Sequence, residues 1–382
     1  MAFLPFYVPR SEPLNLIIIG GGYAGIAALI SLRRHCQAAH ITLIDPGFAH
    51  IKVTHLHETF RRRLSEFVVP FANIAERFGC RHVQAALDIC DRNLEEWHEN
   101  RGLAVHDEFL DFDYLVIATG AGAPSPEKDE CVYDLGDLMQ TDGSVLMERI
   151  PKESRGVVTV VGGGATGMQF LFEIAAFIGS QSLPLGIRLV DGEDSVLKQF
   201  APDLGRYAQS RMSDLGIDYL PRTFYQGQQN GKVALQGRDD GRCFEQDSCA
   251  AFVFSGKKPN TMLTTNLFGQ VVAGGKVLPK VFAAGDCSHY RGVGSNTLTA
   301  QAAVRKGKLT ARNILRHSGR LKILEPYLHR DMGYVISLGP TDAVGWLALE
   351  GNVVGGYPAL VFKELVEAQY DLLLAGIDTY LI

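Results

Sequence analysis

Two segments of the chain repeat one pattern of apolar and polar positions. Residues 14–45 and residues 157–191 each begin with a short run of aliphatic and β-branched residues. Each continues through a glycine-rich turn and a stretch of helical composition, and finishes with a second apolar run. This second run ends on an acid, which is Asp45 in the first segment and Asp191 in the second. Short, almost wholly apolar runs between turn residues predict buried parallel strands, so each segment is predicted to be a β-α-β unit.

Shorter matching features follow in both halves of the chain. An apolar run at residues 112–120 ends in Thr-Gly, and another at residues 252–256 ends in Ser-Gly. A further run at residues 280–287 ends in Ala-Gly-Asp-Cys, and residues 297–315 have helical periodicity. This internal duplication predicts two similar units within one chain.

These elements predict an α/β fold with two Rossmann-like, three-layer nucleotide-binding domains and a small C-terminal unit. The first domain is expected to be discontinuous, over residues 14–124 and 279–325, with the second domain inserted at residues 125–278. The Gly-Ala-Pro-Ser-Pro stretch at residues 122–126 is the expected linker between them. Residues 326–382 are expected to form the C-terminal unit, and the length of 382 residues suits two or three domains.

Each β-α-β segment carries the spacing G-x-G-x-x-G directly after its first strand. The glycines are Gly20, Gly22 and Gly25 in the first segment and Gly162, Gly164 and Gly167 in the second. The first glycine of such a motif allows a tight turn, the second lets the backbone approach a pyrophosphate, and the third lets helix and strand pack closely. The pyrophosphate then lies at a helix N-terminus, and the acid of the second strand can bond a ribose. Two such motifs predict two bound dinucleotides, and therefore electron transfer between them.

Composition and charge limit the partners and the cellular setting that are expected for this chain. The net charge of −5 gives no reason to expect a nucleic acid partner. The seven cysteines form no C-x-x-C pair and no zinc-binding spacing, so a reduced, cytoplasmic setting is expected. Residues 1–13 contain prolines and lack the apolar core of a signal peptide. No apolar run approaches the roughly 20 residues that span a bilayer.

With these motifs in order, the chain resembles the two-dinucleotide-binding-domain flavoproteins, which are the FAD- and NAD(P)H-dependent pyridine nucleotide oxidoreductases. The resemblance covers residues 14–318 and includes the D-Y-L-V-I-A-T-G and A-A-G-D-C stretches that end at Gly120 and Cys287. It implies that the first motif binds FAD and the second binds the nicotinamide cofactor. The FAD-binding residues it implies are Gly20, Gly22, Gly25, Asp45, Thr119, Gly120, Gly285 and Asp286. Those for the nicotinamide cofactor are Gly162, Gly164, Gly167, Glu173, Asp191 and Gly256.

Within that family the chain is similar to the type II NADH:quinone oxidoreductases and the apoptosis-inducing-factor-like quinone reductases. Residues 46–79 contain no cysteine where the disulfide reductases of the family carry a redox-active pair, so electrons cannot leave through a disulfide there. Residues 299–307 are similar to the family's quinone-site pattern A-Q-x-A-x-Q-x-G. Gln301 matches its first glutamine, and Arg305 replaces the second. At the second fingerprint, Gln169 stands where the family has a glutamate near the nicotinamide and flavin.

The motifs and the resemblance together predict an enzyme that passes a hydride from NADH through FAD to a quinone. Asp191 would repel the 2′-phosphate of NADPH, and Gly192-Glu193 offers no arginine to receive it, so NADH is favoured over NADPH. Gln301 and Arg305 are expected to hold the quinone. Two alternatives stay open: an NADH-binding flavoprotein that acts as a redox sensor or interaction protein, and a reductase of a small electron-carrier protein or of oxygen.

Several charged residues early in the chain are candidates for proton chemistry. His50, His55 and His57 are expected near the flavin, and one of them, or Lys52, could donate a proton to the reduced quinone. No metal is expected, because no carboxylate or cysteine spacing supports the histidines as ligands. The run of residues 61–63, Arg-Arg-Arg, is interpreted as solvated charge.

The tail predicts an amphipathic helix over residues 359–376. Its apolar positions are Leu360, Val361, Leu365, Val366, Leu372 and Leu373. Helices that lie in a membrane interface are normally rich in Lys and Arg, whereas this one sets Lys363 against three acids. We therefore expect it to pack onto the body of the protein or to form the seam of a homodimer, with peripheral membrane contact as the alternative.

Overall fold

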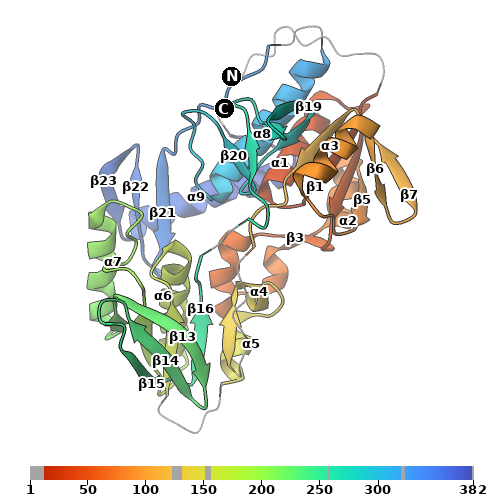
Figure 1. The fold of residues 1–382 in the computed structure, drawn as a ribbon. Coiled ribbons are helices and arrows are strands. Elements are labelled where there is room, and N and C mark those ends of the chain that lie inside the picture. The colour runs from red at the N-terminus through yellow and green to blue at the C-terminus, as the bar shows by residue number, and fades with distance from the viewer. Residues whose placement is uncertain (1–12, 123–130, 151–155, 257–258, 320–322, 381–382) are drawn as a thin grey trace.

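The computed structural model describes residues 13–122, 131–150, 156–256, 259–319 and 323–380. The expectation that the start of the chain is not a signal peptide concerns residues that lie almost wholly outside this range, and so does most of the expected linker at residues 122–126. Figure 1 shows two main sheets in separate parts of the molecule, the first in the upper part and the second in the lower part.

The first sheet has eight strands and is built from both ends of the expected discontinuous domain. Its order is β20 (Ser288–Tyr290), β17 (Leu263–Thr265), β18 (Gln270–Ala273), β19 (Lys276–Ala283), β8 (Tyr114–Ile117), β1 (Asn15–Ile19), β2 (His40–Asp45) and β5 (Arg81–Gln84). The five strands from β19 to β5 run parallel. β17 and β18, which the sequence assigned to the inserted segment, belong to this sheet.

Alternate residues of β1 face two different apolar layers, as the pleat of a strand requires. Leu16 and Ile18 pack against the helices α1 (Tyr23–His35) and α8 (Ala300–Ser318). Ile17 and Ile19 pack on the other side, where α3 (Asp91–Asn100) and the hairpin of β6 (Gly102–Val105) and β7 (Glu108–Asp111) contribute Leu94 and Leu103. The sheet is therefore the middle of three layers. The short helix α2 (Phe71–Phe78) adds Phe71, Ile74 and Phe78 to the α1 side.

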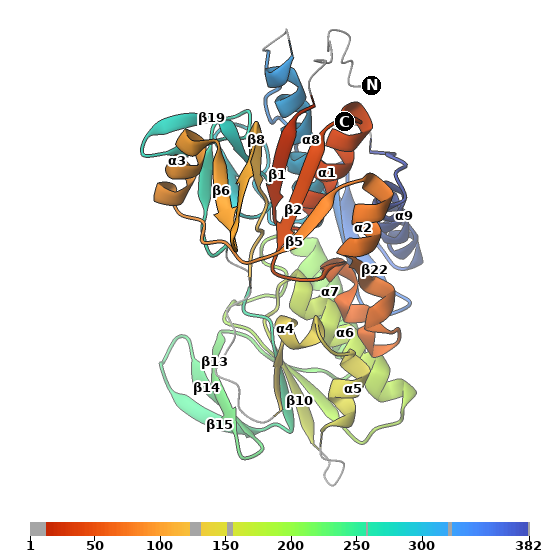
Figure 2. The same cartoon turned by 90° about the vertical axis from the view of Figure 1, so that its right-hand side faces the viewer.

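The second sheet is wholly parallel and has five strands. Its order is β12 (Asp218–Leu220), β11 (Gly186–Val190), β10 (Val157–Val161), β16 (Ala250–Val253) and β9 (Val132–Asp134). One face is covered by α6 (Ala165–Ser180) and α7 (Pro202–Asp214), and the other by an antiparallel sheet of β13 (Thr223–Gln229), β14 (Lys232–Gly237) and β15 (Cys243–Asp247). Figure 2 shows β13–β15 and α6 on opposite sides of β10.

Short elements connect the two sheets. The hairpin of β3 (Ala49–Ile51) and β4 (Val68–Pro70) encloses two 3-10 helices, η1 (Val53–Phe60) and η2 (Leu64–Phe67). The helices α4 (Leu135–Leu138) and α5 (Gly143–Glu148) follow β9. Phe60 of η1 packs into the core of the second sheet, so this part of the chain joins both halves.

The tail bridges the two sheets. Its strands β21 (Gly333–Ser337), β22 (Ala343–Leu347) and β23 (Leu349–Gly355) form an antiparallel sheet, which adds Ile336 and Trp346 to the core beside α6. The helix α9 (Tyr357–Leu374) adds Tyr370 and Leu373 to the core beside α1. The tail therefore packs onto the body of the chain.

The buried face of α9 differs from the one that the sequence predicts. The buried residues are Ala359, Lys363, Tyr370, Leu373 and Leu374. Three of the apolar positions expected to pack, Val361, Leu365 and Leu372, are exposed instead. The difference arises because Lys363 forms ion pairs with carboxylates inside the protein. These ion pairs, as well as hydrophobic packing, determine which side of α9 is buried. Across the described ranges, no helix is long and apolar enough to cross a membrane.

Candidate functional site

A cavity of about 750 Å³ lies where the first sheet, η1, α6 and the tail meet. Many of the residues that the sequence singled out line it, including the three histidines His50, His55 and His57. The others include Gly20, Gly21, Gly22, Asp45, Thr119, Gly120, Gln169, Gly285, Asp286 and Gln301. The structure thus brings the first fingerprint, the Thr-Gly end of β8, the Gly-Asp turn after β19 and the start of α8 to one site.

The first glycine turn has the geometry that a dinucleotide needs. Gly20 has a φ of +103°, and a Cβ built on it would lie 2.2 Å from the carbonyl oxygen of Ala118. A Cβ on Gly25 would lie 1.9 Å from the carbonyl oxygen of Gly20, so only glycine lets α1 pack this close to the turn. A Cβ on Gly22 would meet no protein atom within 4 Å. Gly22 is also the N-cap of α1 and has no side-chain cap, so open space and free N–H groups adjoin the helix start, as a pyrophosphate requires.

The side chain of Asp45 forms hydrogen bonds with the backbone of the same turn. Its Oδ2 accepts a hydrogen bond from the backbone N–H of Gly21 at 2.6 Å, and its Oδ1 accepts one from Gly47 at 2.7 Å. The carboxylate therefore lies at the end of β2 beside the glycine turn. This is the position from which the acid of such a motif reaches a ribose.

The second fingerprint repeats this geometry in the second sheet. Gly162 has a φ of +106°, and its Cβ would lie 2.4 Å from the carbonyl oxygen of Phe254, while a Cβ on Gly167 would lie 1.8 Å from that of Gly162. Gly164 is the uncapped N-cap of α6. Asp191 lies against Gly163, and burial raises the pKa of its carboxyl group. The glycines and Asp191 do not line the 750 Å³ cavity, but Thr166, which lies between Gly164 and Gly167, does, so the second fingerprint reaches the cavity at this residue.

Two cations that the sequence did not place lie beside the acid of this second turn. Arg238 donates to the carbonyl oxygen of Gly192 at 2.8 Å and to Glu193 at 3.1 Å. Lys198 also bonds Glu193, at 2.8 Å. The turn at Gly192-Glu193 therefore does have an arginine nearby, brought there by β14. Glu193 engages both cations.

The tail forms another part of the cavity wall. Met332, Tyr334, Phe362, Val366 and Tyr380 line it together with Gln301 at the start of α8. Sequence reasoning did not identify these five residues as part of the site. The only signal was the apolar periodicity of the tail, which does not say what the helix packs against.

Four of the predicted residues lie elsewhere. Arg305 is half-buried and does not line the cavity, although Gln301, one helical turn earlier on α8, does. Lys52 forms an ion pair with Asp371 at 2.9 Å and is also absent from the lining. Glu173, expected to bind the nicotinamide cofactor, is buried and bonds Arg61. Gly256 has a φ of +94° at the end of β16 and does not line the cavity either.

The three histidines have different environments. His50 bonds the carbonyl oxygen of Gly21 through Nδ1 and the hydroxyl of Tyr370 through Nε2, both at 2.9 Å. Because a carbonyl only accepts, Nδ1 must carry the proton and Nε2 accepts from Tyr370. Burial lowers the pKa of His50 to about 4, so it is neutral at pH 7. This bond ties the glycine turn directly to α9.

His57 is also buried and belongs to a short polar chain. Its Nε2 lies 2.9 Å from the hydroxyl of Ser337, which accepts from the side-chain amide of Gln169 at 3.3 Å. Burial holds the pKa of His57 well below its usual range. Gln169 and His57 both line the cavity, so this chain fixes the orientation of the amide that replaces the family's glutamate.

His55 belongs to a buried group of charges. Its Nδ1 lies 2.9 Å from Glu58 and 3.7 Å from Glu367. Carboxylates thus do accompany the histidines, contrary to the sequence interpretation, and the ligand atoms of these three residues lie within 4.8 Å of one another. Lys363 lies 2.8 Å from Glu367 and 3.9 Å from Glu58, so a protein cation already lies beside this position.

The arginine run at residues 61–63 is exposed, as the sequence suggested, but two of its members also form ion pairs. Arg61 bonds Glu58 at 3.1 Å and Glu173 at 3.2 Å. Arg62 bonds Glu58 and Glu66 and stacks over the ring of Phe67. Arg61 therefore connects η1 of the first half to α6 of the second half.

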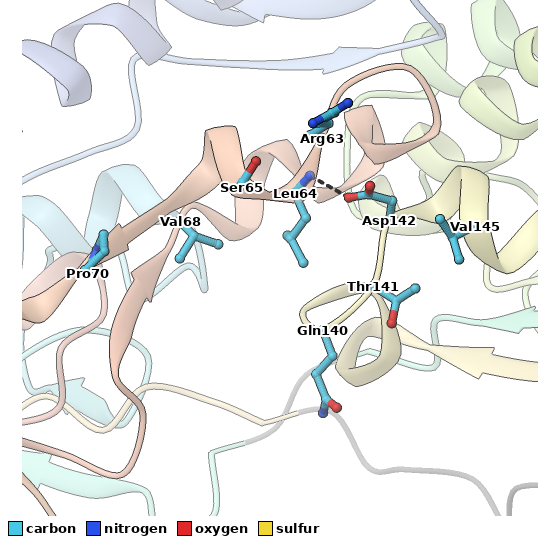
Figure 3. A pocket seen from close by; sticks show the side chains of 9 residues that line it. All are labelled: Arg63, Leu64, Ser65, Val68, Pro70, Gln140, Thr141, Asp142 and Val145. Atoms are coloured by element: carbon cyan, nitrogen blue, oxygen red, sulfur yellow. Dashed lines mark hydrogen bonds between the residues drawn. The ribbon is translucent and has the colours of Figure 1, made fainter.

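A second, more open hollow lies at the same junction. Figure 3 shows its residues on η2, β4 and the segment from α4 to α5, with the backbone N–H of Leu64 donating to Asp142 at 2.6 Å. Its other polar lining side chains are scattered around the rim, and the nucleotide-binding residues described above lie outside it.

Comparison with known proteins agrees with this geometry. The sequence model of the pyridine nucleotide-disulphide oxidoreductases matches residues 14–307. The chain belongs to that family. It is 24% identical over 403 residues to a type II NADH:quinone oxidoreductase of Staphylococcus epidermidis, covering 95% of this chain and 96% of that protein. It is 26% identical over 381 residues to the demethylphylloquinone reductase NdbB of Synechocystis, covering 92% and 91%.

Solved structures show the same fold. NDH2 from Plasmodium falciparum in complex with NADH has a TM-score of 0.76 at 15% identity, with 94% of each chain covered. The sulfide:quinone oxidoreductase of Aquifex aeolicus has a TM-score of 0.78 at 15% identity, covering 95% of this chain and 92% of that one. Family membership and fold confirm the predictions of an α/β oxidoreductase and of FAD and NADH as its cofactors.

Proposed function

We propose that this enzyme oxidises NADH and reduces a quinone, with FAD bound in the 750 Å³ cavity. The observation that carries the proposal is the continuity of that cavity. Its wall combines the first glycine turn, Asp45, Gly285 and Asp286 with apolar residues of the tail. Such a space suits a flat, largely apolar acceptor beside the cofactor, held by a few polar groups.

The lining also supports a small-molecule acceptor. None of the described residues that line the cavity is a cysteine, and all seven cysteines of the chain are free thiols. Cys287, the one beside the Gly-Asp turn, is fully buried against the backbone. A protein disulfide is therefore not available at this site to carry electrons onward.

The residues present fit FAD. The open space above Gly22, the uncapped start of α1 and Asp45 suit the pyrophosphate and ribose, and Asp286 suits the ribityl chain that the family resemblance implies. When bound, FAD accepts a hydride from NADH and returns two electrons to the acceptor. The start of α8 adjoins the same space and directs its positive end toward it, which favours negative charge there.

Four residues have proposed roles toward the substrates. Gln301 donates to a carbonyl of the quinone, and Gln169, held by Ser337, orients the reacting groups without carrying a proton. Asp191 binds the ribose of NADH and disfavours the 2′-phosphate of NADPH. We retain Arg305 only as an indirect contributor, through its charge behind Tyr380, which lines the cavity.

We also infer the division of the chain into domains and the role of the exposed face of α9. The two sheets support the division into a discontinuous FAD domain, an inserted NADH domain and a C-terminal unit, with the second boundary placed before β17 instead of at residue 278. The exposed apolar positions of α9 support a homodimer seam, with peripheral attachment to the inner face of a membrane as the alternative in a cytoplasmic setting.

Turnover tests the proposed function. The purified protein is expected to be yellow and to oxidise many equivalents of NADH when a soluble quinone is present. A single reduction followed by slow reoxidation would instead indicate a redox sensor. Turnover with oxygen or a carrier protein, but not with quinone, would retain the enzyme and change the acceptor.

A further inference from the structure

The charged group beneath the cavity contains one more acid than permanent cation. Its carboxylates are Glu58, Glu173 and Glu367, and its cations are Arg61 and Lys363. Arg62 also bonds Glu58, but it pairs with the further acid Glu66, so the excess is unchanged. A buried carboxylate without a compensating charge is costly, and such a group commonly takes up a proton instead. Burial raises the pKa of two of these carboxyl groups, Glu173 and Glu367, so these two are the groups that can hold the proton.

Glu58 is not the carboxyl group that holds this proton. Its side chain is buried, which by itself would raise its pKa. The hydrogen bond with His55 and the nearby positive charges outweigh this effect and hold the pKa below its usual range. Glu58 is thus the ionised centre of the group.

Glu367 has the position of a proton donor to the cavity. It lines the cavity, whereas Glu173 does not. One of its oxygens, Oε1, bonds Lys363 at 2.8 Å, while Oε2 is buried and has no hydrogen-bond partner among the described residues. Burial raises the pKa of Glu367, against the opposing effects of Lys363 and His55. Its side chain is 14% exposed, so it can exchange a proton with water.

We propose that Glu367 is the catalytic acid of acceptor reduction, an inference that rests on the proposed function. The overall reaction is NADH + H⁺ + quinone → NAD⁺ + quinol, so one proton is needed in addition to the hydride. Glu367 gives its proton to a quinone oxygen as the two electrons arrive. The resulting carboxylate is stabilised by Lys363 and recovers a proton from water.

Other groups near the cavity are less suited to this role. Both nitrogens of His50 are engaged, and its single proton is donated to the carbonyl oxygen of Gly21. Lys52 is paired with Asp371 and does not line the cavity. Gln169 has no proton to transfer. Position 169 on α6 thus lacks an acid, and Glu367 on α9 supplies it instead.

The pH dependence of this step follows from the groups that face Glu367. They are Lys363 on its own helix, His55 and Glu58 on η1, and Tyr23 on α1. Tyr23 has its pKa raised above its usual range by burial and stays neutral. We expect acceptor reduction to slow as rising pH removes the proton from Glu367.

The variant Glu367→Gln tests the proposal, with Glu364→Gln as the matched control. Both residues lie on α9 and undergo the same Glu→Gln substitution, but Glu364 is exposed and does not line the cavity. Two readouts are taken on the FAD-loaded protein. The first is the infrared carbonyl band of a protonated carboxylic acid in the resting protein, followed against pH. The second is the rate at which NADH-reduced protein reacts with a soluble quinone, measured against pH.

Glu367→Gln is expected to lose one carboxylic acid band and to slow the reaction with quinone about 10²-fold, the lower end of the range for a general acid. Reduction by NADH stays unchanged, and Glu364→Gln matches the wild type in both readouts. Glu367→Asp should regain part of the rate and its pH dependence.

A wild-type rate in Glu367→Gln at every pH would overturn the proposal and leave quinone reduction intact. A retained infrared band would likewise show that the proton lies elsewhere. If the wild-type protein does not reduce quinone at all, the proposed function fails. The infrared titration then decides alone whether Glu367 holds the proton.

Discussion

Glu173→Gln should change how the stability of this protein depends on pH. Glu173 is 1% exposed and pairs with Arg61 across the junction between α6 and η1. Burial raises the pKa of its carboxyl group from 4.5 to about 7, because the pairing with Arg61 only partly offsets the loss of water. The folded protein therefore keeps a proton that the unfolded chain has already released. This contribution favours the folded state below the unfolded pKa and is lost as the pH rises through the folded pKa.

The size of the expected change in stability follows from the pKa shift of Glu173. One pKa unit corresponds to about 1.4 kcal/mol, so a glutamate shifted in this way costs about 3 kcal/mol of stability when fully ionised. Between about pH 5.5 and about pH 7.5 the change is about 2 kcal/mol. Glutamine does not titrate. The free energy of unfolding of Glu173→Gln should therefore rise relative to wild type by about 2 kcal/mol over this range.

Urea unfolding of wild type and variant at a series of pH values measures this difference, with Glu364→Gln as an exposed control. Histidines whose pKa values are lowered, such as His50 and His57, contribute equally to both proteins and cancel in the comparison. A difference in unfolding free energy that stays constant across the range would show that Glu173 does not hold its proton in the folded protein. The electrostatic account of the junction would then be wrong.

Other variants probe separate parts of the structure. Gln301→Ala should lower kcat/KM for a soluble quinone by about 30- to 10³-fold, which is the effect of losing one stabilising donor. NADH-dependent reduction of a dye should persist. Equal losses with quinone and dye would place the quinone site elsewhere. Asp191→Ala should weaken NADH binding. Glu193→Ala frees Arg238 and should raise the rate of flavin reduction by NADPH relative to NADH, measured by stopped flow. An unchanged preference for NADH would contradict the assignment of this turn to the nicotinamide cofactor. Gly25→Ala should lower the FAD content and the Tm, because its Cβ would lie 1.9 Å from a carbonyl oxygen, and a wild-type Tm would contradict that geometry. Tyr370→Phe should cost about 1–2 kcal/mol in urea unfolding by leaving a ring nitrogen of buried His50 unbonded, and no loss would show that this bond contributes little.

The sequence alone determined the fold class and the nucleotide turns. Gly20, Gly25, Gly162 and Gly167 were predicted from spacing, and each occupies a place where a side chain would collide with the backbone. Such turns are local: strand, glycines and helix follow one another within a few residues. A periodic apolar pattern next to them is therefore enough to predict what they build. Asp45 was predicted on the same basis and lies directly at the turn.

Only the tertiary structure decided what completes the site. Met332, Phe362 and Glu367 reach the cavity from a tail that lies about three hundred residues beyond the first glycine turn. Their apolar or acidic character alone does not indicate the neighbour they meet. The same applies to Arg61, interpreted as solvated charge but paired with Glu58 and the distant Glu173. The sequence pattern records whether a side chain favours water, whereas the partner of a buried charge is set by the packing of separate elements. For that reason the two glycine turns were predictable, and the buried charged group beside the cavity was not.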